Sequence, residues 1–237
     1  WPAGFFEILS RSGAASVAIL AVDHPNPARI MSIAEKWARR YGVEPAHQLA
    51  LAAAELPAAI ERLKAAKADA VAVWGCEKAC VAAVKALGKA GWLQGRAAYV
   101  SSSLASGALL TLPAREVEGV FTALPWDIRA SQAFPDGPRF VRAFRAAHGQ
   151  DPDYMAAASY AACQVIEAAV ARARALDKES LRQALSGLET LTVMGRYGVA
   201  PSGMQLRQMP LTLQWQKGKR EVVWPETMRT ALPAVAR

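Results

Sequence analysis

Short, continuous apolar runs alternate with segments of helical periodicity over the first half of the chain. Residues 16–22 (SVAILAV) and 69–74 (DAVAVW) are the clearest runs, and such runs are typical of parallel strands covered on both faces. Weaker strands are predicted at 43–51, 96–101 and 118–124, and helices at 2–12, 27–41, 55–67 and 77–90. Strands and helices alternating at this spacing predict βαβ units and therefore an α/β fold with a doubly wound parallel sheet.

The pattern changes after Pro125. Residues 136–187 are predicted to be almost all helix, with segments at 140–147, 155–176 and 178–188. A hairpin follows, in which the turn at 217–219 (KGK) joins strands at 210–216 and 220–225. We therefore divide the chain into a βα domain at 1–124, a mostly helical segment at 125–208 and a closing hairpin at 209–237. The helical segment has little strand of its own, so it needs a sheet that this chain does not obviously supply.

Composition narrows the classes of protein. Of the 237 residues 53% are hydrophobic, but 51 residues are alanine, which favours helices and argues against an all-β sandwich. No apolar stretch approaches the roughly 18–20 residues of a membrane span. The net charge of +8 is spread along the chain, and its one dense cluster, at 217–220, is typical of a hairpin turn. Nucleic-acid binding, which concentrates basic residues on one face, is therefore not predicted.

The three cysteines do not indicate a metal or redox site. Cys76 and Cys80 have helix-turn spacing, and no histidine or third cysteine is close enough in sequence to complete a zinc set. We interpret them as small buried thiols in an alanine-rich helix and predict neither metal nor cofactor. The first residues, Trp1 to Gly4, include no initiating Met and no signal-peptide pattern, so we expect a cleaved N-terminus or a piece of a longer chain.

Catalytic signatures are missing from the sequence. It contains no glycine-rich phosphate loop, no zinc-protease helix motif and no nucleophile elbow. Of the three histidines only His24 follows a strong strand, and no pair of carboxylates marks an acid–base couple. The sequence therefore predicts no catalytic residue and favours a binding protein over an enzyme.

The predicted sheet indicates where a ligand would bind, because ligands of open parallel sheets lie outside the carboxyl ends of the strands. The loops at three strand ends offer carboxylates, an indole, hydroxyls and the exposed amides of a helix start, which suit an anionic group. The candidate ligand-binding residues are Asp23, His24, Asn26, Trp74, Gly75, Cys76, Glu77, Ser101, Ser102 and Ser103. Two alternatives stay open: that Trp74 belongs to the core, and that residues 101–103 form an ordinary loop.

Several segments, taken in series, resemble the leucine/isoleucine/valine-type substrate-binding proteins of ABC transporters, a branch of the type I periplasmic binding proteins. The resemblance covers nearly the whole chain and keeps the family's order. It rests on residues 16–20 leading to Asp23, 69–75 with the helix that follows, 118–120, 158–162, 191–195 with 202–203, and 213–219.

This resemblance implies a two-lobed fold from which an N-terminal βα segment is missing. Residues 1–124 correspond to lobe 2, 125–208 to the later helices of lobe 1, and 209–237 to a hairpin returning to lobe 2. The crossovers at 124–127 and 209–211 would then carry a hinge that closes around the ligand.

The resemblance also implies a periplasmic or otherwise extracytoplasmic protein that delivers a small polar metabolite to the membrane permease subunits of an ABC importer. Amino-acid-binding members often have an aromatic residue in the first loop and an acidic residue in the third, whereas this chain has residues 25–27 (PNP) and a serine run. An amide, carboxylate or aromatic metabolite is therefore as plausible as an α-amino acid. A sensory ligand-binding domain of a regulator or receptor is the alternative function, and an α/β enzyme is disfavoured.

Overall fold

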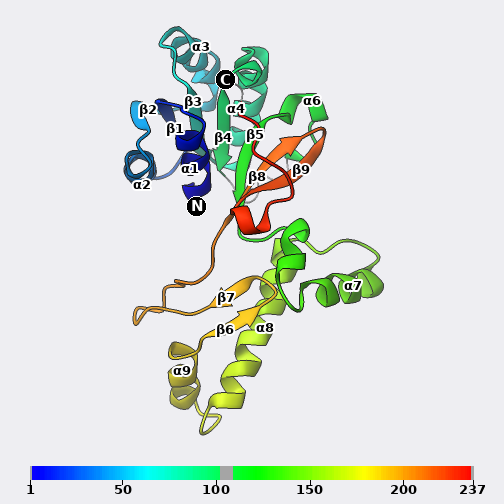
Figure 1. The fold of residues 1–237 in the computed structure, drawn as a ribbon. Coiled ribbons are helices and arrows are strands. Elements are labelled where there is room, and N and C mark those ends of the chain that lie inside the picture. The colour runs from blue at the N-terminus through cyan, green and yellow to red at the C-terminus, as the bar shows by residue number, and fades with distance from the viewer. Residues whose placement is uncertain (1, 102–108, 236–237) are drawn as a thin grey trace. The chain divides into compact units, whose positions relative to one another are not determined.

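The computed structural model describes residues 2–101 and 109–235, and the chain divides into two compact units (Figure 1). Unit 1 comprises residues 1–124 and 212–237, and unit 2 comprises residues 125–211. The second crossover between the units thus lies three residues beyond the boundary expected at 208. The assignment of the units to lobes stays a prediction.

Unit 1 contains a seven-stranded sheet in the order β2-β1-β3-β4-β5-β8-β9. Neighbouring strands from β2 to β5 run parallel, whereas β8 and β9 form an antiparallel hairpin. The strands are β1 (Ser16–Val22), β2 (Glu44–Leu51), β3 (Ala70–Gly75), β4 (Ala97–Ser101), β5 (Val120–Leu124), β8 (Leu211–Gln216) and β9 (Lys219–Trp224).

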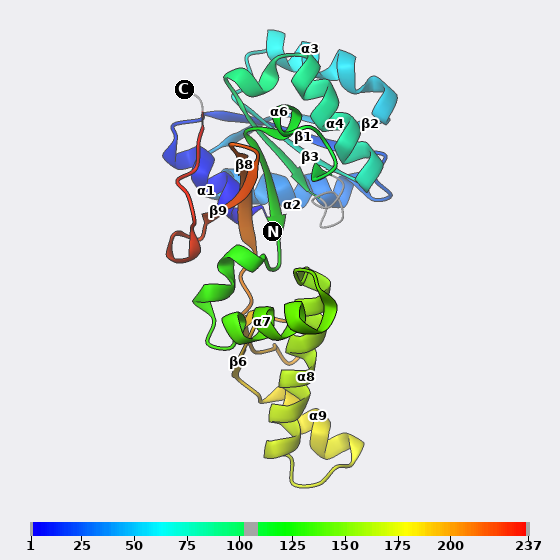
Figure 2. The same ribbon diagram turned by 90° about the vertical axis from the view of Figure 1, so that its right-hand side faces the viewer.

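Helices cover both faces of this sheet (Figure 2). One core packs α1 (Ala3–Arg11) and α2 (Pro27–Arg40) on one face, and a second core packs α3 (Leu56–Ala65) and α4 (Glu77–Lys89) on the other. A short helix, α6 (Ala114–Val117), precedes β5. The predicted doubly wound, mainly parallel sheet is confirmed.

The two cores explain the continuous apolar runs in the sequence. In β1 the side chains of Ala18, Leu20 and Val22 enter the core under α3 and α4, while Val17 and Ile19 enter the core under α1 and α2. Successive side chains of a strand point to opposite faces, so a strand with an apolar core on each side is apolar at every position and shows no alternation.

Unit 2 consists of α7 (Gly137–His148), α8 (Tyr154–Arg172), α9 (Lys178–Ser186) and a small hairpin of β6 (Thr190–Thr192) and β7 (Gly195–Tyr197). The sequence analysis missed this hairpin because strands of three residues are too short to show alternation. The indole Nε1 of Trp126 donates to the carbonyl of Val193 at 3.0 Å, which fixes the hairpin turn to the start of the unit.

The C-terminal tail of unit 1 is held by a buried glutamine. The side-chain nitrogen of Gln214 donates to the carbonyls of Gly119 (3.1 Å) and Ala234 (2.6 Å). Its side-chain oxygen accepts hydrogen bonds from the Ala234 amide (2.8 Å) and from Gln216 (2.7 Å). Since Gln214 is fully buried, every one of these bonds replaces a bond that water would otherwise make.

We predict that Gln214→Ala lowers the free energy of unfolding by about 2–4 kcal/mol, because it removes the hydrogen bonds that hold the tail and leaves a cavity where a fully buried side chain was. Denaturant titration followed by circular dichroism measures the loss, and carboxypeptidase should then shorten the tail faster. Gln132→Ala, at an exposed position, is the control and should change stability by less than about 0.5 kcal/mol. Equal stability of the two variants would contradict this account of the tail.

Candidate functional site

The register of the parallel strands brings three strand ends to one edge of the sheet. Val22 lies beside Leu51 on one side and Gly75 on the other, and Trp74 lies beside Ser101. The loops after β1, β3 and β4 therefore begin at the same edge, as the sequence analysis expected of its candidate residues. Of these candidates, Ser102 and Ser103 lie outside the described residues.

Asp23 turns the chain sharply at the end of β1. Its φ of 45° is in the left-handed region, which Asp tolerates better than most residues. Its backbone amide donates to the Leu51 carbonyl at 3.1 Å, and its Oδ2 accepts from the Ala53 amide at 3.3 Å. The side chain is exposed, so the carboxylate is available at the sheet edge while one of its oxygens ties β1 to the end of β2.

His24 and Asn26 have local structural roles. The Nδ1 of His24 accepts from the Asn26 amide at 3.0 Å, and the Asn26 side-chain oxygen accepts from the Arg29 amide at 3.2 Å. Asn26 is thus the N-cap of α2, with Pro27 in the first turn. These bonds set the path of the loop between β1 and α2.

Gly75 allows β1, β3 and α4 to approach closely. A Cβ at this position would lie 2.6 Å from the Val22 carbonyl oxygen and 2.9 Å from the Ala79 Cβ, so no larger residue fits without moving the backbone. Cys76, expected to be buried, is exposed, because it is the N-cap of α4 and precedes the first buried turn of the helix, whereas Cys80 is buried as expected. The exposed Glu77 begins the helix, where its charge is favourable. The glycine therefore places a helix start at the sheet edge.

Trp74 lies in the core on the face covered by α1 and α2. Only 8% of its surface is exposed, and its ring lies 5.5 Å from that of Tyr99. This placement favours the alternative that Trp74 is a core residue over direct contact with a ligand. Ser101, at the end of β4, is half-buried.

Tyr99 is a polar residue near this edge that the sequence analysis did not single out. It is fully buried, and its hydroxyl has no hydrogen-bond partner within residues 2–101 and 109–235. Burial raises its pKa, so the hydroxyl keeps its proton. The one sequence signal was a tyrosine inside a short strand of otherwise small apolar residues.

The groups exposed at this edge are ones that can hold polar or charged parts of a molecule. The edge exposes the carboxylates of Asp23 and Glu77, which attract cations, beside helix amides that attract anions. No group of three potential metal ligands occurs in the part of the chain that the structure describes. Within the same ranges, no helix is both long enough and apolar enough to span a bilayer.

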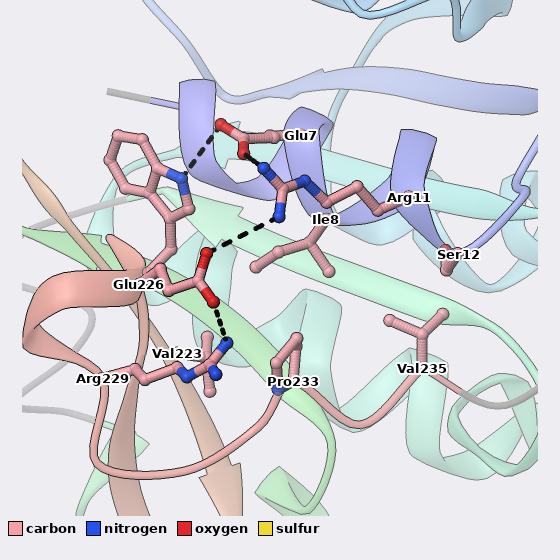
Figure 3. Close-up of a pocket in the computed structure, with 10 residues that line it drawn as sticks. Glu7, Ile8, Arg11, Ser12, Val223, Glu226, Arg229, Pro233 and Val235 are labelled. Carbon is pink, nitrogen blue, oxygen red and sulfur yellow. Dashed lines mark hydrogen bonds and ion pairs between the residues drawn. The ribbon is translucent and has the colours of Figure 1, made fainter.

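A separate hollow of about 260 Å³ lies between α1 and the C-terminal tail (Figure 3). Its charges neutralise one another: Arg11 pairs with Glu7 (2.7 Å) and Glu226 (3.9 Å), and Glu226 also pairs with Arg229 (3.1 Å). Glu7 also accepts from the indole of Trp224 at 3.0 Å. We assign no ligand to this hollow, because its polar groups already pair with one another and hold α1 against the segment after β9.

A doubly wound sheet with polar loops at its carboxyl edge defines an α/β fold of the kind that holds ligands at strand ends. A family model described as periplasmic binding protein matches residues 2–220. Since this match spans most of the chain, the chain belongs to the periplasmic binding protein family, and the resemblance seen in the sequence is confirmed.

Solved structures of similar fold agree. A putative branched-chain amino acid ABC transporter protein from Rhodospirillum rubrum matches with a TM-score of 0.77 and 22% identity, over 93% of this chain and 64% of its own. A solute-binding protein from R. palustris in complex with benzoate has a TM-score of 0.69 and 16% identity, over 99% and 63%. A substrate-binding protein from Desulfitobacterium hafniense in complex with Leu has a TM-score of 0.71 and 18% identity, over 93% and 63%.

The chain thus spans about 63% of the length of these solved relatives. Comparison with curated proteins gives no match.

The three thiols should differ sharply in reactivity. Burial raises the pKa of Cys80 to about 12, and its Sγ donates to the Gly75 carbonyl at 3.7 Å, whereas Cys76 and Cys163 are exposed. We predict that a disulfide reagent at about pH 8 modifies two thiols in the native protein and the third only after unfolding. A Cys76→Ser variant should lose one fast thiol, and three fast thiols in the unmodified sequence would contradict the burial of Cys80.

The same shift predicts a pH dependence of stability. The Cys80 thiol is neutral in the folded protein up to about pH 12, but in the unfolded chain it ionises near pH 9. Its contribution to stability is therefore complete below about pH 9 and declines as the pH rises from 9 towards 12. Cys80→Ala should weaken this decline in alkaline denaturation curves.

Proposed function

We propose that this chain is a ligand-binding protein that delivers a small polar metabolite to an ABC importer from an extracytoplasmic compartment. The observation that carries the proposal is that three strand ends reach one edge of the sheet, beside exposed Asp23, Cys76 and Glu77, in a member of this family. The proposal gives the chain no catalytic role, because the described residues of the site can hold a molecule but include no nucleophile–base pair.

The ligand class follows from the charges at the sheet edge. Asp23 and Glu77 suit an ammonium or amide group, and the amides at the start of α4 suit a carboxylate. Two relatives are described as complexes with Leu and with benzoate, which share a carboxylate and differ in the ammonium group. An amino acid, an amide or a carboxylate metabolite therefore fits this edge.

Delivery to a permease requires a signal that ligand is bound. In the proposed mechanism the crossovers at residues 124–127 and 209–211 act as a hinge, and membrane permease subunits recognise the closed form. A ligand shifts the equilibrium from the open to the closed form only if it binds the closed form more tightly. No contact with nucleic acid is part of this proposal.

The ligand test uses isothermal calorimetry with L-leucine and benzoate as probes. We predict weak binding, with Kd between about 0.1 and 10 mM, because this chain supplies one wall of the proposed cleft. Asp23→Asn should weaken leucine binding about fivefold or more and leave benzoate binding within twofold, since Asn keeps the bond to Ala53 and removes the charge.

Glu61→Gln, an exposed charge on α3, is the matched control and should change neither affinity. Micromolar or tighter binding would contradict the prediction that this chain supplies only one wall of the proposed cleft. Absence of binding for both probes at about 10 mM, together with no small molecule co-purifying in mass spectra, would contradict the proposed function.

Unit 2 supports the proposed assignment of residues 125–208 to a lobe that needs a further sheet. Nine of the twelve exposed large hydrophobic residues of the described chain belong to unit 2, and neither hydrophobic core includes a residue from it. On α8, exposed positions spaced as one helical face form a stripe that mixes large and small side chains. The stripe is Met155, Ser159, Ala162, Cys163, Ile166 and Val170.

We propose that this α8 stripe is a face that a further βα layer would cover, as the greater length of the solved relatives allows. In this chain Ile166→Glu should change the free energy of unfolding by less than about 0.5 kcal/mol, because Ile166 is 57% exposed. At the aligned position of the Rhodospirillum rubrum relative, a charge should cost about 3 kcal/mol or more, since the residue there would be buried. Denaturant titration measures both, and equal small effects in the two proteins would contradict the proposed packing.

A further inference from the structure

A second hollow of unit 1, the α4–α6 groove, lies away from the strand-end site. It has a volume of about 560 Å³. Its lining residues are Val84, Lys85, Gly88 and Lys89 from α4 and Arg115 and Glu116 from α6. At a rise of 1.5 Å per residue, Lys85 and Lys89 lie roughly 14–20 Å along α4 from Cys76. The groove is therefore a different surface from the candidate ligand site.

The α4–α6 groove carries an excess of positive charge. Lys85, Lys89 and Arg115 are exposed, and within the described ranges none of them forms an ion pair. Lys85 and Lys89 are one turn apart on α4, a spacing at which like charges repel. The C-terminal end of a helix favours a cation such as Lys89, but α6 is a single turn and gives Arg115 no such compensation. The fold itself therefore does not account for the three charges together.

Gly88 is a second, independent feature of the groove. It stands exposed in the last turn of α4, and nothing lies within 4 Å of the position that its Cβ would occupy. Glycine is unfavourable in a helix relative to alanine, and no packing within the chain requires it at this position, in contrast to Gly75. Its effect is to leave the α4 backbone open to close approach between Lys85 and Lys89.

We infer that the α4–α6 groove docks an acidic segment of a protein partner. The cations come from two elements around a space much larger than one inorganic anion, so they match several carboxylates along a chain. Glu116, half-buried in the same wall, repels carboxylates and phosphates alike, but unlike the three cations it can accept a backbone N–H from a peptide. Gly88 gives that peptide room to lie flat against α4. The inference does not rest on the proposed transport function.

Fluorescence anisotropy with a fluorescein-labelled peptide of six glutamates tests this docking. Binding should weaken as NaCl is raised, because the contacts are exposed ion pairs. The triple variant Lys85→Gln/Lys89→Gln/Arg115→Gln should bind at least tenfold more weakly. Gly88→Leu should also bind at least fivefold more weakly, and its melting temperature should stay the same or rise, since leucine is the better helix former.

The matched control removes the same charge from exposed arginines of unit 2, as Arg139→Gln/Arg142→Gln/Arg174→Gln, and should bind within twofold of the unchanged chain. Equal weakening of the groove and control variants would overturn the proposal in favour of general charge attraction. Vesicles containing phosphatidylglycerol that bind the unchanged chain, lose binding in the groove variant and displace the peptide would overturn it in favour of a lipid surface.

Discussion

The contact at Gly75 sets the geometry on which the rest of unit 1 depends. At this residue β3 passes so close to the Val22 carbonyl and to Ala79 that a single methyl group would collide with both. The contact holds the ends of β1 and β3 level, and the backbone ladder continues that register to Ser101 on β4. Parallel strands held in register end at one edge, so the segments that follow them begin there. The position of the candidate site is thus a consequence of strand packing.

The two units differ in how completely they bury apolar surface. Unit 1 has a core on each face of its sheet, whereas unit 2 buries a smaller set of apolar side chains, among them Trp126, Phe140 and Val193, and leaves other large apolar side chains exposed. Apolar burial is the main favourable term in folding, so unit 1 has the stronger basis for stability on its own. The α8 stripe mixes large apolar and small side chains, a composition typical of a helix face that packs against another element.

Sequence reasoning succeeded where a physical pattern extends over many residues. The run at 16–22 predicted a strand buried on both faces, and β1 is such a strand, because its successive side chains enter the two cores alternately. It failed for β6 and β7, which are three residues long and are held by the hydrogen bond from Trp126, 67 residues away from its partner in sequence. At the candidate site, the pattern of apolar strands predicted which edge of the sheet the residues occupy, but it did not predict which of their side chains are buried. The ring of Trp74 packs at a tilt against that of Tyr99, and such contacts between strands leave no local signal.

The most direct test of the central claim, that the carboxyl edge of the sheet holds the ligand, is hydrogen–deuterium exchange with and without saturating L-leucine or benzoate. The account predicts slower exchange in residues 23–26 and 75–79, with no change in α3 or in the hairpin of β8 and β9. Slower exchange confined to the tail around Glu226 and Arg229, where the hollow beside α1 lies, would contradict it and move the site to that hollow.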